Sequence, residues 1–463
     1  MTRGASNAAA AATTAAANLH DVYIVSAART PIGSFLGSLR GVPAVELAAV
    51  AIRGALDRSR LPTSAVSECV LGNVLGANTG QAPARQAALR ASLPVATVCT
   101  TVNKVCASGL KAVNLAADSL ALGRGGAAGA AIAGGAESMS LAPHYLEGLR
   151  GSGRGGGRFG WPTVGDRPAI DAITRDGLSD GTLGALMGSL ADTLAAAEGI
   201  SREEQDHHAT HSYLRAAKAA HAGLFADEIV AVKAADGSVV LGEDEEVHRF
   251  ASVDVLTTLK PAFPASADRS GRGGGSGKGD KAATAAVSNG GVGRGTITAG
   301  NASSLSDGAA AVVLATGDAV AKYGLSPLAR ILAYADAEGP PEAFPTAPIP
   351  AVQAALGRAG LAIDDVDVWE VNEAFSAAAV AVNRGLGLEA ARVNVRGGAV
   401  AMGHPIGASG ARILVTLLSV LKERGGGYGV AAVCNGGEGR PHLSSSGFRE
   451  REGGGWGGCA AAV

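Results

Sequence analysis

The stretch NKVCASGLKAV, residues 103–113, places a cysteine directly before a run of small residues and the start of an expected helix. Much later in the chain, GHPIGASGARI, residues 403–413, repeats the Ala-Ser-Gly and basic signature behind a histidine. Each stretch leads into an apolar helix, a glycine-rich turn and an apolar strand that ends in Gly-Gly, AAIAGG at 130–135 and GVAAVCNGG at 429–437. The interval from Gly109 to Gly134 nearly equals that from Gly410 to Gly436. Two signatures in the same order at near-equal spacing predict a duplicated α/β half.

Strand and helix patterns alternate on both sides of these signatures. DVYIVSAART (21–30) and ECVLGNVLG (68–76) are apolar runs typical of buried strands, and AVELAAVAIRGALDRS (44–59) has helical spacing. Interleaved helices and apolar strands predict mainly parallel sheets that are covered on both faces. Farther along, Ser201 with Glu204 forms a capping-box pattern that predicts the start of a long helix.

Glycine-rich, low-complexity segments lie within one predicted domain. Residues 149–160 and 267–295 contain too little apolar surface to offset the entropy of ordering them, so we expect flexible surface insertions. The first 20 residues are rich in alanine and contain no acidic residue, which predicts a disordered or transit tail. We therefore expect an N-terminal domain from 21–139 and 306–325, a loop domain at 140–305, a C-terminal domain at 326–440 and an atypical tail at 441–463.

Composition excludes several classes of function. The chain of 463 residues has a net charge of −2 and 17% charged residues, which gives no reason to expect a nucleic-acid partner. It contains no apolar run long enough for a membrane span. Five unclustered cysteines are typical of free thiols in a reducing compartment rather than of a disulfide framework or a zinc site.

The predicted duplication makes Cys106 and His404 candidates for one common site. Corresponding loops of two related halves face each other, so their side chains can converge on one pocket. Cys106 is expected just before a helix N-terminus, where backbone N–H groups favour a thiolate. A lone cysteine is more often a small buried apolar residue, and a histidine between glycines is more often a loop residue. An imidazole near a thiol, however, is the usual arrangement for an activated nucleophile.

Three further residues are candidates at the ends of predicted strands. Cys434 ends an apolar strand and is either a core cysteine or a proton carrier for carbon-acid chemistry. Asn372 lies where an apolar strand meets a helix, so its amide either caps that helix or holds a water or an oxyanion. The backbone N–H groups of Gly436 and Cys106 could donate to a thioester oxygen.

These residues resemble the thiolase family, and within it the biosynthetic acetyl-CoA C-acetyltransferases (acetoacetyl-CoA thiolases). Six stretches follow the family motifs in the family order: SAARTPIGSFLGSL, NKVCASGLKAV, GGAESMS, NASSLSDGAAA, WEVNEAFS and GGAVAMGHPIGASGAR. The resemblance runs from about Asp21 to Gly437, most of the chain, and HSYLRAAKAA and PLARILAYADA are most similar to the mitochondrial-type, potassium-activated enzyme. It implies two mixed-sheet α/β halves in αβαβα layers with an inserted CoA-binding loop domain.

The resemblance also implies a ping-pong Claisen reaction. Cys106 would carry an acetyl group, with His404 accepting its proton, and Cys434 would then remove a proton from a second acetyl-CoA. His404 with an Asn372-held water, and the amides of Cys106 and Gly436, would bind the oxyanions. No redox cofactor is expected: coenzyme A enters as the thioester substrate, with acetyl-CoA, acetoacetyl-CoA and CoA as the small-molecule partners. The positions that match the family's CoA contacts are Met187, Ser303, Leu305, Ala374 and Phe375.

Further implied properties concern an ion, the substrate pocket and assembly. A potassium ion is expected at the hydroxyl of one tyrosine and at four backbone carbonyls; the matching positions are Tyr213, Ala299, Gly300, Ala302 and Val400. Phe344-Pro345 resembles the dipeptide linked to acceptance of 2-methyl-branched acyl groups. A homodimer or homotetramer is expected, in the cytoplasm or alternatively in mitochondria.

Three departures from the family pattern leave other functions open. Leu186 replaces a usual histidine, and Glu438 lies in a loop that is otherwise nearly all glycine. The residues after this loop, RPHLSSSGFREREGGGWGGCAAAV, do not read as the apolar strand that closes the family fold, so we expect that strand to be missing. The alternatives are a degradative 3-ketoacyl-CoA thiolase of fatty-acid β-oxidation, or a catalytically impaired thiolase-fold protein.

Overall fold

The computed structural model describes residues 19–126, 129–147, 149, 168–249, 252–263, 295–436 and 456–462. Nearly all of the predicted N-terminal tail and of the two glycine-rich insertions, and Glu438, lie outside these described residues. Within the described part of the chain, no helix is both long and apolar enough to cross a membrane.

The N-terminal half is one mixed sheet with helices on its faces. Its elements are β1 (Val22–Arg29), β2 (Gly33–Ser34), α1 (Ala44–Ser59), β3 (Val66–Gly72), α2 (Pro83–Arg90), β4 (Val98–Val102), α3 (Ser108–Ala121), β5 (Ala130–Ser138), β10 (Ser306–Thr316), α7 (Gly317–Tyr323) and β11 (Ala329–Arg330). The strand order is β11-β1-β10-β5-β3-β4, with β2 also paired to β10. Strands β3, β4 and β5 are parallel, whereas β10 is antiparallel to both β1 and β5. The prediction of mainly parallel sheets is therefore wrong, because the long β10 returns between two strands that run the other way.

The C-terminal half repeats this arrangement. Its elements are β12 (Ala333–Gly339), α8 (Pro348–Ala359), β13 (Val368–Val371), α9 (Ser376–Leu386), α10 (Ala399–Met402), α11 (Ile406–Glu423), β14 (Gly429–Asn435) and β15 (Trp456–Ala462). The order β12-β15-β14-β13 matches β1-β10-β5-β3, with the same parallel and antiparallel pairs. The predicted duplication is confirmed strand by strand.

Strand β15 contradicts the expectation that the closing strand is missing. Its backbone pairs antiparallel with β12 on one side and with β14 on the other, so that Gly458 lies opposite Cys434. The sequence WGGCAAA lacks the large apolar residues by which strands are usually found. A strand between two partners, however, gains its hydrogen bonds from the backbone, and small residues do not interfere with them.

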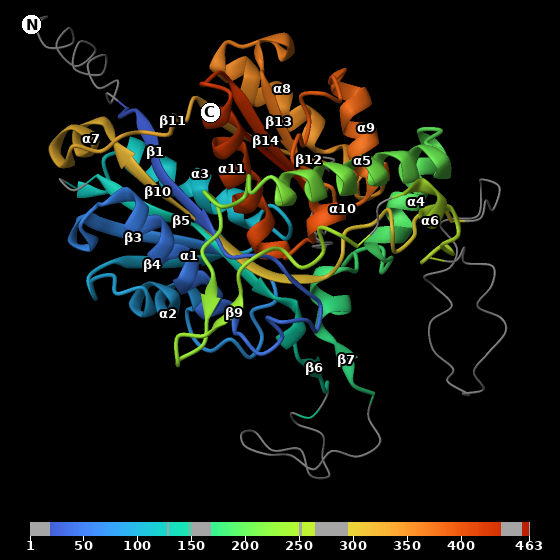
Figure 1. The fold of residues 1–463 in the computed structure, drawn as a ribbon, viewed down its shortest axis with the longest axis horizontal. Coiled ribbons are helices and arrows are strands. Elements are labelled where there is room, and N and C mark those ends of the chain that lie inside the picture. Colours follow the sequence, from blue (N-terminus) through green and yellow to red (C-terminus); the bar gives the residue numbers. More distant parts are fainter. Residues whose placement is uncertain are drawn as a thin grey trace, which may run out of the picture.

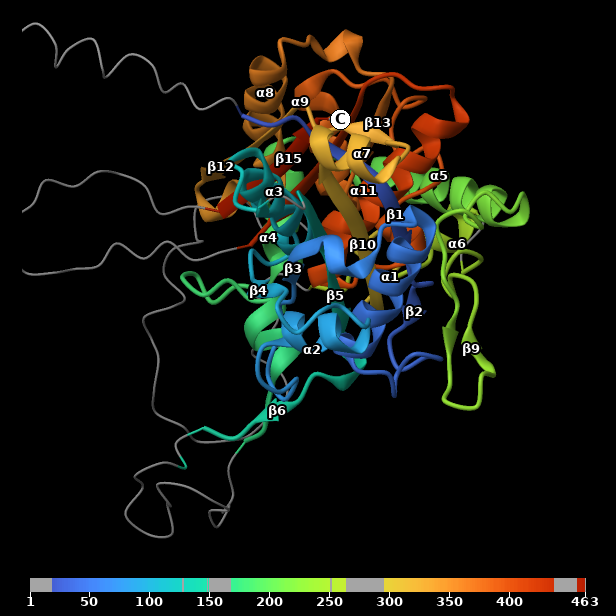
Figure 2. The same cartoon turned by 90° about the vertical axis from the view of Figure 1, so that its left-hand side faces the viewer.

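Five layers follow from the two halves, α-β-α-β-α. In Figure 1, α1 and α2 lie outside the first sheet, α8 and α9 lie outside the second, and α3 with α11 lies between the sheets. Figure 2 shows the same order of layers from the side. The buried residues of α3 and α11 share one apolar cluster with residues of both sheets. The predicted αβαβα fold is confirmed.

Glycines of the repeated Ala-Ser-Gly signature allow the two central helices to pack closely. A Cβ atom on Gly410 would lie 2.5 Å from the backbone nitrogen of Leu110, and one on Gly109 would lie 2.8 Å from that of Ala411. Neither separation is tolerated by real Cβ atoms. The signature therefore serves the contact between the two halves, and this contact fixes the helix N-termini behind Cys106 and His404.

The chain between β5 and β10 forms an excursion beside the layers, which we propose as the loop domain. Its elements are β6 (His144–Tyr145), β7 (Ile170–Asp171), α4 (Met187–Ala197), α5 (Arg202–His221), β8 (Val232–Lys233), β9 (Val239–Leu241) and α6 (Val253–Thr257). The predicted cap of α5 is present, because the Ser201 side chain accepts a hydrogen bond from the Glu204 backbone N–H at 3.1 Å.

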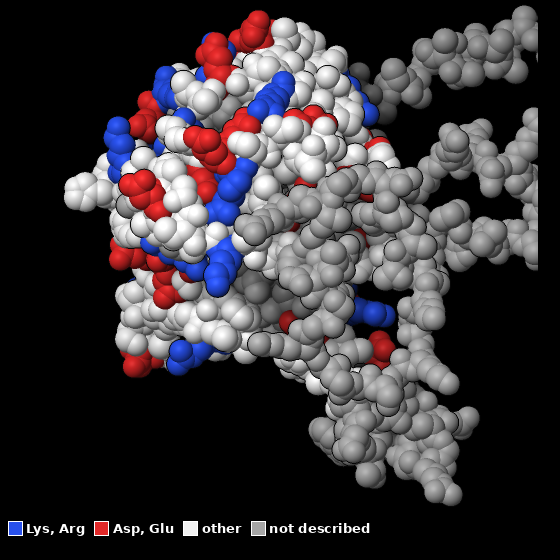
Figure 3. Space-filling view, turned by 90° about the vertical axis from the view of Figure 1, so that its right-hand side faces the viewer, with Lys and Arg blue, Asp and Glu red and all other residues white. Residues whose placement is uncertain are grey.

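Buried charges attach the excursion to both halves. Arg29 of β1 binds Glu228 at 2.8 Å and Asp244 at 2.7 Å, and Arg396 of the C-terminal half binds Glu228 at 2.9 Å. On the surface, by contrast, both signs of charge are interspersed over the described residues of the face in Figure 3, in keeping with the small net charge.

Candidate active site

Cys106 lies at the end of a tight turn between β4 and α3, two residues before the helix begins. Val105, just before it, has a φ of 47°, which is a strained conformation for a β-branched residue. Two side chains hold this turn. Asn103 accepts from the Val105 N–H at 2.9 Å, and Ser108 accepts from the Lys104 N–H at 2.8 Å. Strain maintained in this way, directly before a cysteine, is typical of a functional position.

Cys106, Cys434 and Gly436 converge. The Cys106 side chain is partly accessible, yet desolvation and the neighbouring Cys434 raise the pKa of its thiol far above the ordinary value. The backbone N–H groups of Cys106 and Gly436 act in the opposite direction by hydrogen bonding to the same sulfur. Burial raises the pKa of Cys434 to about 12. Both resting cysteines are therefore thiols at neutral pH, and two backbone N–H groups donate to the Cys106 sulfur.

His404 lies in the loop before α11, two residues before that helix begins, as Cys106 does before α3. Its ring Nδ1 is 2.6 Å from the Ser409 hydroxyl, and that hydroxyl donates its own proton to the Pro405 carbonyl at 3.0 Å. In the arrangement that satisfies both contacts, the imidazole donates from Nδ1, which leaves Nε2 as an acceptor. Nε2 is buried and has no partner among the described residues. Burial and the nearby Arg412 lower the pKa of His404 to about 3, so the ring is neutral and can accept a proton.

The position of His404 is tied to that of Cys106 by shared neighbours. Ile406, which begins α11, packs in the same apolar cluster as Cys106. Glu137 at the end of β5 accepts from the backbone N–H groups of Val74, Leu75 and Gly407 at 3.0–3.1 Å, and its charge acts on the Cys106 thiol. The Glu137 carboxylate thus joins the loop after β3 to the N-terminus of α11.

Asn372 follows β13 and does not cap α9. Its backbone N–H donates to the Ala432 carbonyl at 2.9 Å, but neither side-chain polar atom has a partner among the described residues, although both are buried. Buried amides without partners are rare and usually hold a water or a ligand. The carboxylate of the next residue, Glu373, accepts several hydrogen bonds. Burial alone would raise its pKa, but hydrogen bonds from His208, Ser212 and Asn394 lower it to about 2.

The residues predicted to contact CoA line the surroundings of the two cysteines. Met187, Ala374 and Phe375 pack in one apolar cluster with Cys434 and Phe344. Leu305 packs against the cluster that contains Cys106. Ser303 donates from its hydroxyl to the Ala374 carbonyl at 2.9 Å. Pro345 is buried next to Phe344 in a short helical turn.

The predicted potassium ligands offer only oxygen atoms. Tyr213 of α5 is 1% exposed and shares an apolar cluster with Val400 of α10. Ala299, Gly300 and Ala302 lie together in the turn before β10. In the described part of the chain, the carbonyl oxygens of these three turn residues accept no backbone hydrogen bond. A set of neutral carbonyl and hydroxyl oxygens suits a hard cation better than a transition metal.

Sequence reasoning missed Glu137, Ser409 and the buried pair of Glu370 with Arg412, whose nearest atoms are 3.6 Å apart. Glu370 and Glu137 have pKa values raised by burial, to about 8 and about 7. The signal was available for Ser409 and Arg412, because both belong to the repeated signature. Nothing in a single sequence marks a carboxylate in a glycine-rich strand as buried.

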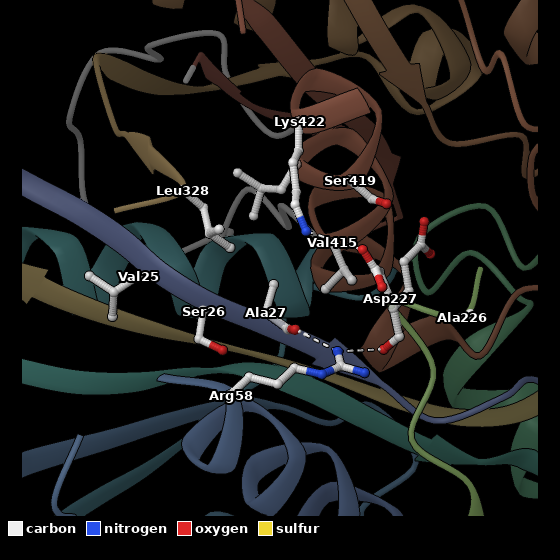
Figure 4. A pocket seen from close by; sticks show the side chains of 12 residues that line it. Val25, Ser26, Ala27, Arg58, Ala226, Asp227, Leu328, Val415, Ser419 and Lys422 are labelled. Carbon is white, nitrogen blue, oxygen red and sulfur yellow. Dashed lines mark hydrogen bonds and ion pairs between the residues drawn. The ribbon is translucent and has the colours of Figure 1, made fainter. Parts of the chain in front are cut away.

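A cavity of about 430 Å³ lies away from these residues, between β1, the end of α1, the 226–228 loop and the end of α11. Figure 4 shows Arg58 crossing its floor, where the guanidinium donates to the Ala27 and Glu228 carbonyls at 2.8 and 3.0 Å. Lys422 above it pairs with Asp227. Its charged groups are thus engaged with each other or with the backbone, and it contains none of the predicted site residues.

Comparison with known proteins shows which families and relatives this chain is similar to. The family described as "Thiolase, N-terminal domain" matches residues 22–276, and "Thiolase, C-terminal domain" matches 325–442. Acetyl-CoA acetyltransferase 2 of Arabidopsis thaliana is 46% identical, over 93% of this chain and 98% of that protein. The mitochondrial acetyl-CoA acetyltransferase of Bos taurus is 44% identical, over 91% and 90%. A relative in Gibberella zeae is named as cytosolic, at 44% identity over 91% and 97%.

A solved structure agrees with the fold over nearly the whole chain. A thiolase from Ascaris suum, crystallised in complex with coenzyme A, is 39% identical to this chain and superimposes with a TM-score of 0.77. The match covers 96% of this chain and 99% of that one.

Proposed function

The chain belongs to the thiolase family, and from this membership we propose that it is an acetyl-CoA C-acetyltransferase. It joins two molecules of acetyl-CoA into acetoacetyl-CoA and free CoA, and it catalyses the reverse thiolysis. The observation that carries the proposal is the convergence of Cys434 and the N–H groups of Cys106 and Gly436 on the Cys106 thiol.

The first half-reaction forms an acetyl-enzyme. The Cys106 sulfur attacks the carbonyl carbon of acetyl-CoA while Nε2 of His404, which is unprotonated in the resting enzyme, takes the thiol proton. The negative charge on the thioester oxygen is bound by hydrogen-bond donors, each typically worth about 10²–10³ in rate. The CoA sulfur leaves and takes a proton from Cys434, so that a Cys434 thiolate and a His404 imidazolium remain.

The second half-reaction makes the carbon–carbon bond. The Cys434 thiolate removes a proton from the α-carbon of a second acetyl-CoA; its raised pKa makes it a strong base for this weak carbon acid. The carbanion attacks the acetyl carbon on Cys106, and the released Cys106 thiolate takes back the proton from His404. In our proposal His404 with an Asn372-held water binds the enolate oxygen, and the amides of Cys106 and Gly436 bind the oxygen of the acetyl-enzyme.

Binding of CoA is assigned to the residues around the cysteines. Met187, Ser303, Leu305, Ala374 and Phe375 would contact the cofactor portion of the substrate, and Phe344-Pro345 would border the acyl group. The packing of most of these residues in one cluster with Cys434 supports this assignment. Acceptance of 2-methyl-branched acyl groups follows as a proposal, tested by thiolysis of 2-methylacetoacetyl-CoA.

A potassium ion would be held by the Tyr213 hydroxyl and the carbonyls of Ala299, Gly300, Ala302 and Val400. When bound it would order the turn that carries Ser303 and Leu305. We expect faster thiolysis in potassium than in sodium buffer at equal ionic strength, and equal rates would refute the ion's role.

The remaining proposals concern assembly and location. A homodimer or homotetramer is supported by the strand at the sheet edge, β4, whose outer side is unpaired among the described residues and where Val98 is 63% exposed; light scattering of the purified protein tests it. We propose the cytoplasm, with mitochondria as the alternative, and imaging of a fluorescent fusion decides between them.

The two functional alternatives are not favoured. The similar proteins named above are acetyl-CoA acetyltransferases rather than degradative thiolases, and β15 supplies the strand whose expected loss had suggested an impaired protein. Comparing thiolysis of acetoacetyl-CoA with that of a long-chain 3-ketoacyl-CoA tests the first point.

The decisive assay measures thiolysis of acetoacetyl-CoA by wild type and by Cys106→Ala. Loss of the nucleophile should lower kcat by about 10³-fold or more. Cys99→Ser, a change at a cysteine of β4 outside the site, serves as the matched control and should keep wild-type activity. Activity that survives Cys106→Ala would remove this residue as the nucleophile.

A further inference from the structure

Two cysteines outside the active site lie side by side on neighbouring strands. Cys69 of β3 and Cys99 of β4 are direct partners in the parallel register. Laterally paired residues project to the same face of a sheet, and adjacent strands are about 4.7–4.9 Å apart. That spacing falls within the Cα separation of about 4.4–6.8 Å that a disulfide requires. The Cys69 thiol already hydrogen-bonds the Cys99 sulfur.

The face that these cysteines occupy is separate from the catalytic one. Cys69 belongs to the apolar cluster under α1 and α2, and Cys99 packs against that cluster. Cys106 packs instead in the clusters on the α3 and α11 side of the same sheet. The sheet therefore lies between this pair and the catalytic thiols. Oxidation of Cys69 and Cys99 does not require a reaction at Cys106 or Cys434.

The surroundings make the two sulfurs unequal. Cys69 is fully buried, whereas Cys99 is partly exposed on the edge strand. The Arg85 guanidinium, which is anchored on the Thr97 and Val95 carbonyls at 2.8 and 2.6 Å, lies beside Cys99. The Cys69 thiol and Arg85 lower the pKa of Cys99 to about 6, whereas the pKa of Cys69 is raised. An accessible thiolate with a neighbouring thiol behind it is the arrangement of redox-sensing cysteines.

We propose that Cys99 and Cys69 form a thiol oxidation site that is distinct from the catalytic cysteines and takes a small peroxide as its oxidant. The Cys99 thiolate attacks one peroxide oxygen, and the O–O bond breaks to give a sulfenic acid and hydroxide. The Cys69 sulfur then attacks the sulfenic sulfur; the S–O bond breaks, and water leaves with the Cys69 proton. The two sulfurs have lost two electrons, and the peroxide has gained them. A disulfide across adjacent strands is strained and hence readily reduced, so the site is reversible.

Peptide mapping tests the proposal on the full-length protein. The protein is treated with hydrogen peroxide, free thiols are blocked with N-ethylmaleimide, and trypsin is added. Cleavage after Arg and Lys separates Cys69 (61–85), Cys99 (91–104) and Cys106 (105–111) into different peptides. We expect loss of the free Cys99 thiol, a link between peptides 61–85 and 91–104, and its disappearance with dithiothreitol.

Variants separate this site from the catalytic thiols. Cys99→Ser should abolish the link and leave Cys69 reduced, and Cys69→Ser should leave a Cys99 sulfenic acid that dimedone traps. Cys106→Ser should leave the link intact. The proposal is overturned if Cys99 stays fully alkylable after peroxide treatment, or if Cys99 joins Cys106 or Cys434 instead. It is also overturned if peroxide oxidises Cys99 to a sulfinic acid without any link to Cys69.

Discussion

At the scale of single residues, the site depends on groups that are held away from their relaxed state. Val105 keeps a left-handed backbone before Cys106. Among the described residues, one ring nitrogen of His404 and the side-chain amide of Asn372 have no hydrogen-bond partner. Such features cost free energy, and they persist because neighbours such as Ser108 and Ser409 fix the surrounding turns. The sequence pointed to Cys106, His404, Cys434 and Asn372 through their motifs. It could not reveal which ring nitrogen of His404 accepts a proton. That depends on the Ser409 hydroxyl, which contacts the ring at Nδ1 and donates to the Pro405 carbonyl.

Ser409→Ala tests that dependence. Without the hydroxyl, nothing keeps the His404 proton on Nδ1, so we expect kcat of thiolysis to fall by about 10- to 100-fold, since a positioned general base contributes about 10²–10⁴. KM for acetoacetyl-CoA should change little, because Ser409 is buried behind the ring. Ser409→Thr restores a hydroxyl and should recover part of kcat. Equal kcat in wild type and Ser409→Ala would contradict the role.

The lowered pKa of His404 predicts a specific dependence of stability on pH. The folded protein resists protonation of His404 down to about pH 3, whereas the unfolded chain takes up this proton near pH 6.5. Between these values the unfolded state binds more protons, so this residue makes folding less favourable as the pH falls. His404→Asn removes the effect. The unfolding temperature of wild type, relative to that of the variant, should decline from pH 6.5 to pH 4; parallel curves would contradict the assignment.

At the scale of helices and strands, local pattern predicted the elements but not all of their pairings. Apolar runs located β1, β3, β5 and β14, and the repeated signature located α3 and α11, because burial leaves a strong mark on composition. The antiparallel place of β10 between β1 and β5 was missed, since strand order depends on contacts between distant segments. The close contact of α3 with α11 explains why both copies of the signature contain glycine. From the sequence alone, this glycine is visible only as one of several small residues.

Gly410→Ala and Gly357→Ala form a matched test of this contact. The first adds a Cβ at 2.5 Å from a backbone nitrogen of the opposing helix, so it should lower the free energy of unfolding by about 1–3 kcal/mol. The second adds a Cβ to α8 with nothing within 4 Å, so helix propensity should raise that free energy by about 0.5–1 kcal/mol. Denaturant titration gives both values. If both substitutions changed the free energy of unfolding in the same direction, the contact between α3 and α11 would not determine the effect of Gly410→Ala.

At the scale of the whole molecule, segments far apart in sequence complete each other. The last described strand, β15, lies between β12 and β14, and Glu228 links Arg29 at the start of the fold to Arg396 near its end. The duplication predicted two halves from the sequence. It did not predict β15, because a strand paired on both sides can consist of glycine and alanine, which a search for apolar alternation rejects.

Ala460→Pro tests whether β15 closes the second sheet. Ala460 lies opposite Ala335 on one side and Ala432 on the other, so the loss of its N–H removes a bond of the ladder. We expect a loss of about 3 kcal/mol or more in stability, with thiolysis falling in step because Cys434 is on the adjacent strand. Ala460→Thr keeps the N–H and serves as the control. A wild-type unfolding temperature in Ala460→Pro would contradict the pairing.

The most direct test of the account is to identify the residue that carries the acetyl group. The protein is incubated with acetyl-CoA alone, stopped with acid and digested with trypsin, which isolates Cys106 in peptide 105–111. We predict one acetyl group on that peptide and its removal when CoA is added before the acid. An active preparation in which peptide 105–111 stays unmodified, or in which the acetyl group is on Cys434, would contradict Cys106 as the nucleophile of this site.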